Sequence, residues 1–249
     1  MELVILASLC IIAILYSSVG HGGASGYLAV LSLTMYGTMD SAWLKQHVWF
    51  LNLIVAGIAF GHYRRFKFHN YNLTWPFVIA SVPFAFIGGY LHVNGVIYDT
   101  LLSITLIWAA YKLYKIQGTE NYQNNIPSLK ITLPIGGFIG LLSGIIGVGG
   151  GIFLSPILLI NGWGSPKVVA ATSALFIWVN SASGLLGATI SKQLIVDFEI
   201  ILPFGLAVII GGLIGSYYGS KLAPQKTVKS VLIGVLLIAS MKRIFEIIN

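Results

Sequence analysis

Long apolar segments alternate with short polar stretches along the whole chain, and each half contains five of them. They cover residues 3–19, 24–37, 41–61, 74–92 and 96–114, and then 131–146, 151–162, 167–190, 199–219 and 227–248. The last three segments of each half are long enough to cross a membrane, since a crossing needs about 20 helical residues. The second segment of each half is too short: residues 151–162 would form about 18 Å of helix against a hydrocarbon core of about 30 Å. The pattern therefore predicts that the first two segments of each half form a hairpin of broken helices.

Each short segment begins at a glycine-rich sequence, GHGG at 20–23 and GVGGG at 147–151. Glycine runs interrupt helices because glycine costs more backbone entropy than other residues and tolerates left-handed torsions. Non-helical backbone at membrane depth is tolerated only where it is buried in protein or lines a water-filled cavity. We therefore expect a glycine-rich elbow inside the membrane in each half.

The two halves align with each other at one constant register. Gly20, Gly22, Gly23, Pro76, Gly88, Tyr90 and Lys115 fall on Gly147, Gly149, Gly150, Pro203, Gly215, Tyr217 and Lys242. This register predicts a first repeat over 1–116, a linker over 117–130 and a second repeat over 131–249. Because each repeat crosses the membrane an odd number of times, the two repeats are expected to have inverted topology. The predicted fold is an all-α integral membrane protein of two such repeats.

Composition supports a membrane location. The chain is 57% hydrophobic and only 8% charged, with a mean hydropathy of +0.89, whereas a soluble domain carries roughly a quarter charged residues. The net charge of +7 lies mainly in short loops between apolar segments, so we expect the lipid bilayer and no nucleic acid as a partner. The basic loop 62–72 and the linker 117–130 are predicted to be cytoplasmic and both termini to be outside a cell (inner) membrane. A homo-oligomer is compatible with this pattern.

Both short segments begin at their elbows and so direct helix N-termini into the membrane. Free N–H groups and the positive end of the helix dipole favour an anion at that position. Inverted repeats with interrupted helices in matching positions are typical of transporters that bind substrate near the midplane. The alternative is that the glycines only allow close packing of helices.

The sequence SGIIGVGGGIFLSPILL (143–159), followed by AATSALF (170–176), resembles the TauE/SafE family of sulfite exporters and related anion permeases. SSVGHGGASGYLAVLSL (17–33) is similar to a diverged first copy of the same motif, and the resemblance extends over the whole chain. It implies a carrier of sulfite, sulfonates or other sulfur-containing organic anions. The first copy departs from the second, because His21 and Ser25 stand where the second has Val148 and Ile152.

Polar residues on the third segment of each half provide further candidates. Lys45, Trp49 and Asn52 share one helical face, and Ser173 and Asn180 lie on a corresponding stripe in the second half. Polar groups within a membrane are costly and usually face the bundle interior or a cavity. Such residues can also act only as hydrogen-bonding contacts between helices.

The sequence thus predicts a non-enzymatic secondary transporter that needs no cofactor and no metal. The predicted substrate-binding residues are Gly20, His21, Gly22, Gly23, Ser25, Lys45, Trp49, Asn52, Gly147, Gly149, Gly150, Gly151, Ser173 and Asn180. Two alternatives stay open. An anion channel with two helix N-termini would have a similar sequence, and the GASG sequence at 23–26 could supply an intramembrane serine protease with Ser25 as nucleophile and His21 or His47 as base.

Overall fold

The computed structural model describes residues 2–91, 126–228 and 230–231, and all regular elements within these ranges are helical. They are α1 (Glu2–Ser17), α2 (Ala24–Ser32), the 3₁₀ helix η1 (Met35–Thr38), α3 (Ser41–Arg65), α4 (Tyr71–Tyr90), α6 (Leu129–Ile146), α7 (Gly151–Ile160), α8 (Pro166–Ile190), α9 (Phe198–Tyr217) and the π-helical turn η2 (Tyr218–Leu222). The predicted segment 96–114, residues 117–125 of the predicted linker and nearly all of segment 227–248 lie outside the described residues.

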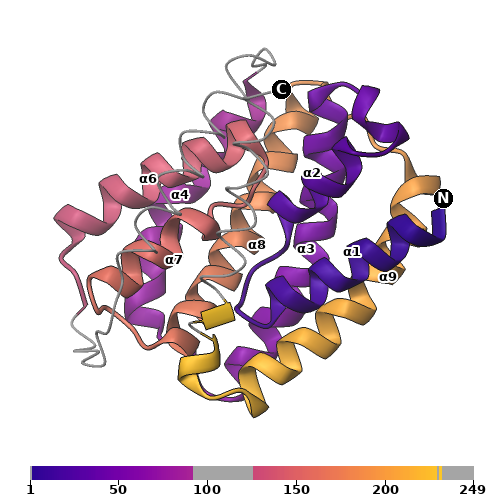
Figure 1. Cartoon of the computed structure of the whole chain (residues 1–249). Coiled ribbons are helices and arrows are strands. Elements are labelled where there is room, and N and C mark those ends of the chain that lie inside the picture. The colour runs from indigo at the N-terminus through magenta and orange to yellow at the C-terminus, as the bar shows by residue number, and fades with distance from the viewer. Residues whose placement is uncertain (1, 92–125, 229, 232–249) are drawn as a thin grey trace, which may run out of the picture.

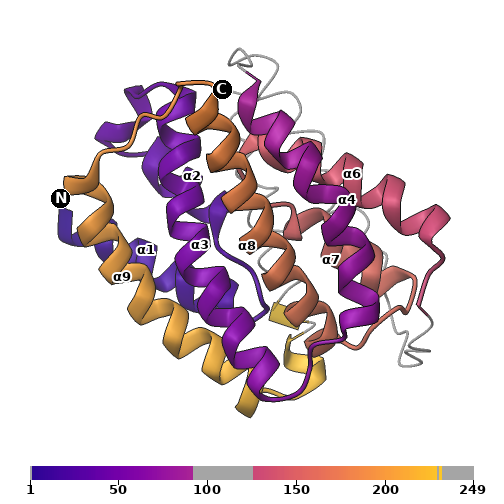
Figure 2. The same ribbon diagram turned by 180° about the vertical axis from the view of Figure 1, so that it is seen from behind.

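Helices α3 and α8 pack against each other at the centre of the bundle. Figures 1 and 2 show α1, α2 and α9 on one side of this pair and α4, α6 and α7 on the other. Helix α9 packs against α1 and α3, and α4 packs against α6 and α8. Each half of the chain therefore contributes a peripheral helix to the other half's hairpin.

Five helices are long and apolar enough to cross a membrane, namely α3, α4, α6, α8 and the stretch Phe198–Leu222. The long central helices have clear start signals: Asp40 caps α3 by accepting a hydrogen bond from the amide of Ala42, and Pro166 occupies the first turn of α8. Helices α1 and α7 are apolar but shorter. The all-helical, multi-pass membrane architecture is therefore confirmed for this part of the chain.

Both hairpins contain an interrupted helix. The α1–α2 hairpin is non-helical from residue 18 to 23, and the α6–α7 hairpin from residue 147 to 150. The residues before the second helix of each hairpin, Gly23 and Gly150, have left-handed torsions with φ of 100° and 80°. Helices of nine and ten residues reach only about 15 Å, half the thickness of a hydrocarbon core.

One predicted boundary was wrong. Segment 24–37 is not one helix, because α2 ends at Ser32 and a separate 3₁₀ turn begins at Met35. The side chain of Thr34 causes the break by donating to the carbonyl of Leu31 and accepting from the amide of Tyr36, in competition with the helix ladder. Helix α6 begins at Leu129, close to the start of the predicted segment 131–146, and ends at Ile146 as predicted.

Glycines at every fourth residue let the peripheral helices approach closely. On α6, added Cβ atoms at Gly136, Gly140 and Gly144 would meet the backbone of α4. On α9, Gly211 and Gly215 lie in the same way against the backbone of α1. Small residues at this spacing are the usual means by which membrane helices pack, since lipid provides no hydrophobic driving force between them.

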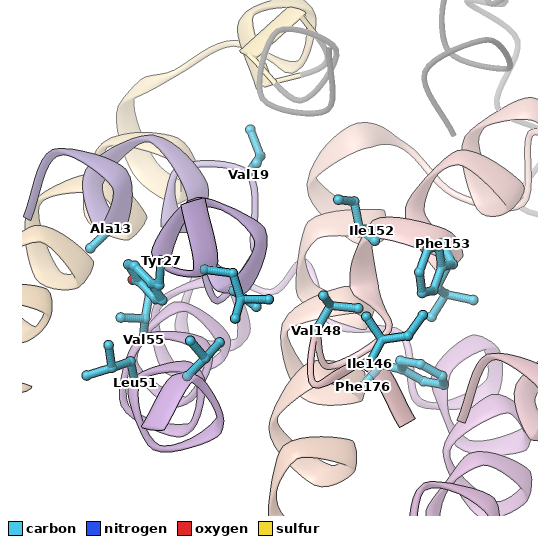
Figure 3. Packing of buried hydrophobic residues seen from close by; sticks show 14 of the residues in the cluster. Ala13, Val19, Tyr27, Leu51, Val55, Ile146, Val148, Ile152, Phe153 and Phe176 are labelled. Carbon is cyan, nitrogen blue, oxygen red and sulfur yellow. The ribbon is translucent and has the colours of Figure 1, made fainter. Parts of the chain in front are cut away.

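The apolar core gathers around the two hairpins. In Figure 3, Tyr27 from α2 lies beside Leu51 and Val55 from α3. A second group, from the α6–α7 hairpin and α8, contains Ile146, Val148, Ile152, Phe153 and Phe176. Buried apolar side chains thus hold each interrupted hairpin against the central helix of its own half.

Candidate functional site

The two glycine elbows meet at the side chain of Asn52 on α3. A Cβ atom on Gly22 of the first elbow would collide with Asn52 Oδ1 and lie 3.2 Å from Ile177 Cγ2 on α8. A Cβ atom on Gly149 of the second elbow would lie 3.1 Å from Asn52 Nδ2 and 2.7 Å from the same Ile177 carbon. One amide and one apolar side chain therefore stand between the two elbows, and both central helices contribute to the site.

Several polar side chains of the two central helices are buried without a hydrogen-bond partner among the described residues. Both amide atoms of Asn52 and of Asn180 are in this state, although each side chain is fully buried. The hydroxyl of Ser181 is also unpartnered, and it would lie 3.2 Å from a Cβ atom on Gly149. Buried polar groups are nearly always hydrogen-bonded, and each unsatisfied one costs about 1–3 kcal/mol. These side chains are thus suited to bind water or a polar solute.

The first turn of α7 adds backbone donors to the same site. Its N-cap residue Gly150 has no side chain to cap the amides, so the first amides of the helix are left without an intrahelical acceptor. The positive end of the α7 dipole therefore lies next to the unpartnered amides. An acidic residue is absent from the first turn of α7, so no side chain of that turn neutralises this end.

His21 of the first elbow connects to the second half through a hydrogen-bonded chain. Its Nδ1 lies 3.0 Å from the carbonyl oxygen of Val19, and its Nε2 lies 3.1 Å from Ser155 Oγ on α7. Ser155 Oγ is also 2.7 Å from Ser173 Oγ on α8 and donates over 2.8 Å to the carbonyl of Gly151. His21, Ser155 and Ser173 are all buried, so this chain links three elements away from solvent.

Lys45 and Trp49 lie on the α3 face that contacts the second elbow. A Cβ atom on Gly147 would collide with the side chain of Lys45, whose Nζ lies 5.1 Å from the centre of the Trp49 ring. Trp49 packs in turn against Gly184 on α8, and its indole N–H has no partner among the described residues. Lys45 is 8% exposed, so its side chain is largely buried beside the elbow.

Other predicted site residues have packing contacts of a different kind. Gly20 packs against the backbone of Ala170, Gly23 against the ring of Tyr27, and Gly150 against Phe176. The geometry around these three glycines is that of close helix and loop packing, and the one polar side-chain atom among the contacts is the hydroxyl of Tyr27 beside Gly23.

Ser25 does not pair with a histidine. Its hydroxyl is 2.8 Å from the hydroxyl of Tyr16, whereas His21 Nε2 faces Ser155 and His47 Nε2 accepts from the amide of Asp197. A serine nucleophile needs a base within hydrogen-bond reach. The serine protease pairs considered from the sequence, Ser25 with His21 or with His47, are therefore wrong.

The sequence alone did not single out Ser155 or Ser181. Ser181 directly follows Asn180 and lies four residues after Ile177, so the helical stripe that identified Ser173 and Asn180 could have been extended to it. Ser155 is a polar residue in an otherwise apolar helix of ten residues, which is a weaker signal.

Comparisons with known proteins agree with this architecture. The family described as Sulfite exporter TauE/SafE matches residues 4–243. A "probable membrane transporter protein" of Sinorhizobium fredii is 30% identical over 237 residues, which cover 93% of this chain and 94% of that protein. A second protein of the same description, from Methanocaldococcus jannaschii, is 26% identical over 246 residues, covering 91% of this chain and 90% of the relative.

No solved structure matches the chain. The family match extends over both hairpins and all five candidate membrane spans, and the alignments cover nearly the full length of both relatives. The protein is therefore a multi-pass membrane transporter, and it belongs to the TauE/SafE sulfite exporter family.

Proposed function

We propose that this protein is a secondary transporter for small anions, in particular sulfite, sulfonates or other sulfur-containing organic anions. The anion would bind between the two glycine elbows, near the middle of the membrane. The observation that carries this proposal is the position of Asn52, whose unpartnered amide lies between Gly22 and Gly149. The side-chain amide of Asn52 and the first backbone N–H groups of α7 would donate to the anion, as helix N-termini do in other anion sites.

The chemistry of the site favours an anion over a cation. Among the described residues near the elbows, the charged side chain in contact is Lys45, through its aliphatic stem, and no carboxylate contacts the glycines. The carboxylates Asp40 and Asp197 lie at the N-termini of α3 and α9, away from the interrupted segments. Backbone N–H groups, amides and one lysine together form a donor-rich environment in a low-dielectric setting.

The proposed scaffold consists of two inverted repeats, 1–116 and 131–249, joined by the linker 117–130. Packing supports this division, because contacts of α1 with α9 correspond to contacts of α6 with α4, and contacts of α3 with α9 correspond to those of α8 with α4. In the proposed orientation loop 62–72 and the linker are cytoplasmic and the termini are outside. Transport would involve rocking of one repeat against the other around the elbows.

A thermal-shift screen of the purified protein tests the proposed ligand class. We expect sulfite, thiosulfate, sulfoacetate or taurine to stabilise the protein, with small carboxylates as comparison anions, since a ligand at 100 times its Kd adds about 2.7 kcal/mol to the folded state. The shift should disappear in Asn52→Leu. A shift of the same size in Asn52→Leu, or no shift with any of these anions, contradicts the proposal.

An anion channel is the second candidate, because a fixed pore lined by the same groups would bind the same ions. Counterflow in proteoliposomes separates the two. A carrier preloaded with unlabelled anion accelerates the uptake of labelled anion, and its flux saturates, whereas a channel gives neither behaviour. The interrupted short helices, which end halfway through a hydrocarbon core, favour the carrier.

A further inference from the structure

The hydrogen-bonded chain at His21 lacks one hydrogen when the histidine is neutral. It contains four contacts: His21 Nδ1 to Val19 O, His21 Nε2 to Ser155 Oγ, Ser155 Oγ to Gly151 O, and Ser155 Oγ to Ser173 Oγ. Each contact needs one hydrogen. A neutral imidazole supplies one N–H, and the two hydroxyls supply one hydrogen each, so only three of the four contacts can be hydrogen bonds.

A second proton on His21 completes the chain. The imidazolium donates from Nδ1 to the carbonyl of Val19 and from Nε2 to Ser155 Oγ. Ser155 then donates to the carbonyl of Gly151 and accepts from both His21 and Ser173, which is the full capacity of a hydroxyl. Loss of that proton leaves Ser155 with one hydrogen for two acceptors, His21 Nε2 and the carbonyl of Gly151, so one of these two hydrogen bonds is unmade.

We propose that His21 is the proton-binding residue of the transporter and that a proton crosses the membrane together with the anion. This inference rests on the proposed anion transport. The proton would bind to Nε2 from one side and leave from Nε2 on the other. A buried imidazolium is costly when alone, but an adjacent anion compensates its charge, so proton and anion favour each other's binding.

The position of His21 fits this role. It lies between Gly20 and Gly22 in the first elbow, and its Cδ2 is 3.6 Å from where a Cβ atom on Gly151 would lie, at the first residue of α7. Histidine is also the side chain whose ordinary pKa lies closest to physiological pH. Protonation of His21 therefore adds a positive charge next to the elbow where the anion would bind.

Other groups around the chain are less suited to carry the proton. Within residues 2–91 and 126–231, apart from 229, the buried titratable or charged groups on α1, α2, α3 and α8 are Tyr16, Tyr27, Lys45, His47, Tyr63 and Lys167, besides the half-buried Cys10, and α7 has none. Tyr63 donates to the carbonyl of Ser18, and Lys167 donates to the carbonyl of Ser220. Lys45 contacts the second elbow and is the one rival that the experiment must separate from His21.

The test is gradient-driven uptake in proteoliposomes with the membrane potential clamped at zero and a pH dye inside. Radiolabelled sulfoacetate, thiosulfate, sulfite and methanesulfonate serve as probes. If one proton accompanies a monovalent anion, each unit of imposed pH difference should give about tenfold accumulation. The dye should report proton entry together with the anion in the wild-type protein.

The variants are scored by the ratio of uptake with and without the gradient, which does not depend on how much active protein is present. In His21→Gln this ratio should fall to about one. His47→Gln is the matched control, because His47 is also a fully buried histidine with two hydrogen bonds, yet it binds the Trp43 carbonyl and the Asp197 amide instead. Its ratio should equal that of the wild type.

The outcomes separate the coupling from the transport itself. Anion uptake by the wild-type protein without dye response, or a gradient ratio that survives in His21→Gln but is lost in Lys45→Gln, overturns the role of His21. Absence of uptake for all four probes overturns the proposed function, and with it this inference. If His21→Gln does not insert, the wild-type dye response still decides whether a proton moves with the anion.

Discussion

Replacement of Gly149 by alanine should block the site while leaving the bundle folded. Gly149 has φ of 72°, a conformation that costs an L-amino acid about 1–2 kcal/mol. The new Cβ atom would lie 2.7 Å from Ile177 Cγ2 and 3.1 Å from Asn52 Nδ2, the two side chains between the elbows. Ile177 can shift by a few tenths of an ångström, but the methyl group then occupies the space beside the unpartnered amide.

The expected result has two parts. Thermal unfolding in detergent should show a loss of about 1–2 kcal/mol, because strain in one residue is small against a folded bundle. Anion binding should weaken at least about tenfold, which corresponds to 1.4 kcal/mol or more of lost interaction. Uptake per inserted molecule in proteoliposomes measures the second effect, and Gly149→Val should abolish it.

Gly162→Ala is the matched control. Gly162 has φ of 65° in the loop after α7, so alanine there suffers the same backbone strain outside the elbows. We expect a similar loss of stability with normal uptake. Equal loss of uptake in both variants would show that backbone strain alone causes the effect. Normal uptake by Gly149→Ala would refute the elbow site.

Three further substitutions test the site and the scaffold. Asn52→Leu removes a buried unpartnered amide, so we expect the stability to be unchanged or higher by up to about 1–3 kcal/mol, together with loss of anion binding. A large loss of stability would show that the amide is hydrogen-bonded to other parts of the folded protein. Gly215→Val places a Cβ atom against the carbonyl of Ile14 and should destabilise the α1–α9 contact by about 1–3 kcal/mol or more. Gly61→Val should be tolerated, because a Cβ atom there would have no other atom within 4 Å, and equal unfolding temperatures of the two variants would contradict this packing. Gln46→Leu removes hydrogen bonds to the Gln193 carbonyl (2.7 Å) and the Ile195 amide (2.6 Å), so protease cleavage in residues 191–197 should accelerate. Unchanged cleavage would show that these two hydrogen bonds do not hold the loop.

Local signals were sufficient to predict the interrupted hairpins. The glycine-rich sequence at 147–151 disfavours a continuous helix, because glycine loses more backbone entropy in a helix than other residues do. The apolar segment that follows it is too short to span the membrane. The helices found at Gly151–Ile160 and Pro166–Ile190 begin within one residue of their predicted starts. The break after Ser32 was missed because it depends on the side-chain hydrogen bonds of Thr34, which hydropathy does not register.

The composition of the site was less predictable, because it depends on how the two halves pack. Asn52 was predicted from its helical stripe, but its position between Gly22 and Gly149 arises from the crossing of α3 with both hairpins. The connection from His21 to Ser155 joins residues far apart in the chain, one on each hairpin. No periodicity within either half contains that information.

Localisation of a bound anion tests the central claim most directly. Selenite is a close analogue of sulfite, and its selenium scatters anomalously, so an anomalous difference map from a crystal grown with selenite would reveal its position. If the elbows bind the anion, an anomalous peak should lie between Gly22 and Gly149, within hydrogen-bonding distance of the Asn52 amide. Peaks only elsewhere on the protein, or none at the elbows, would contradict it.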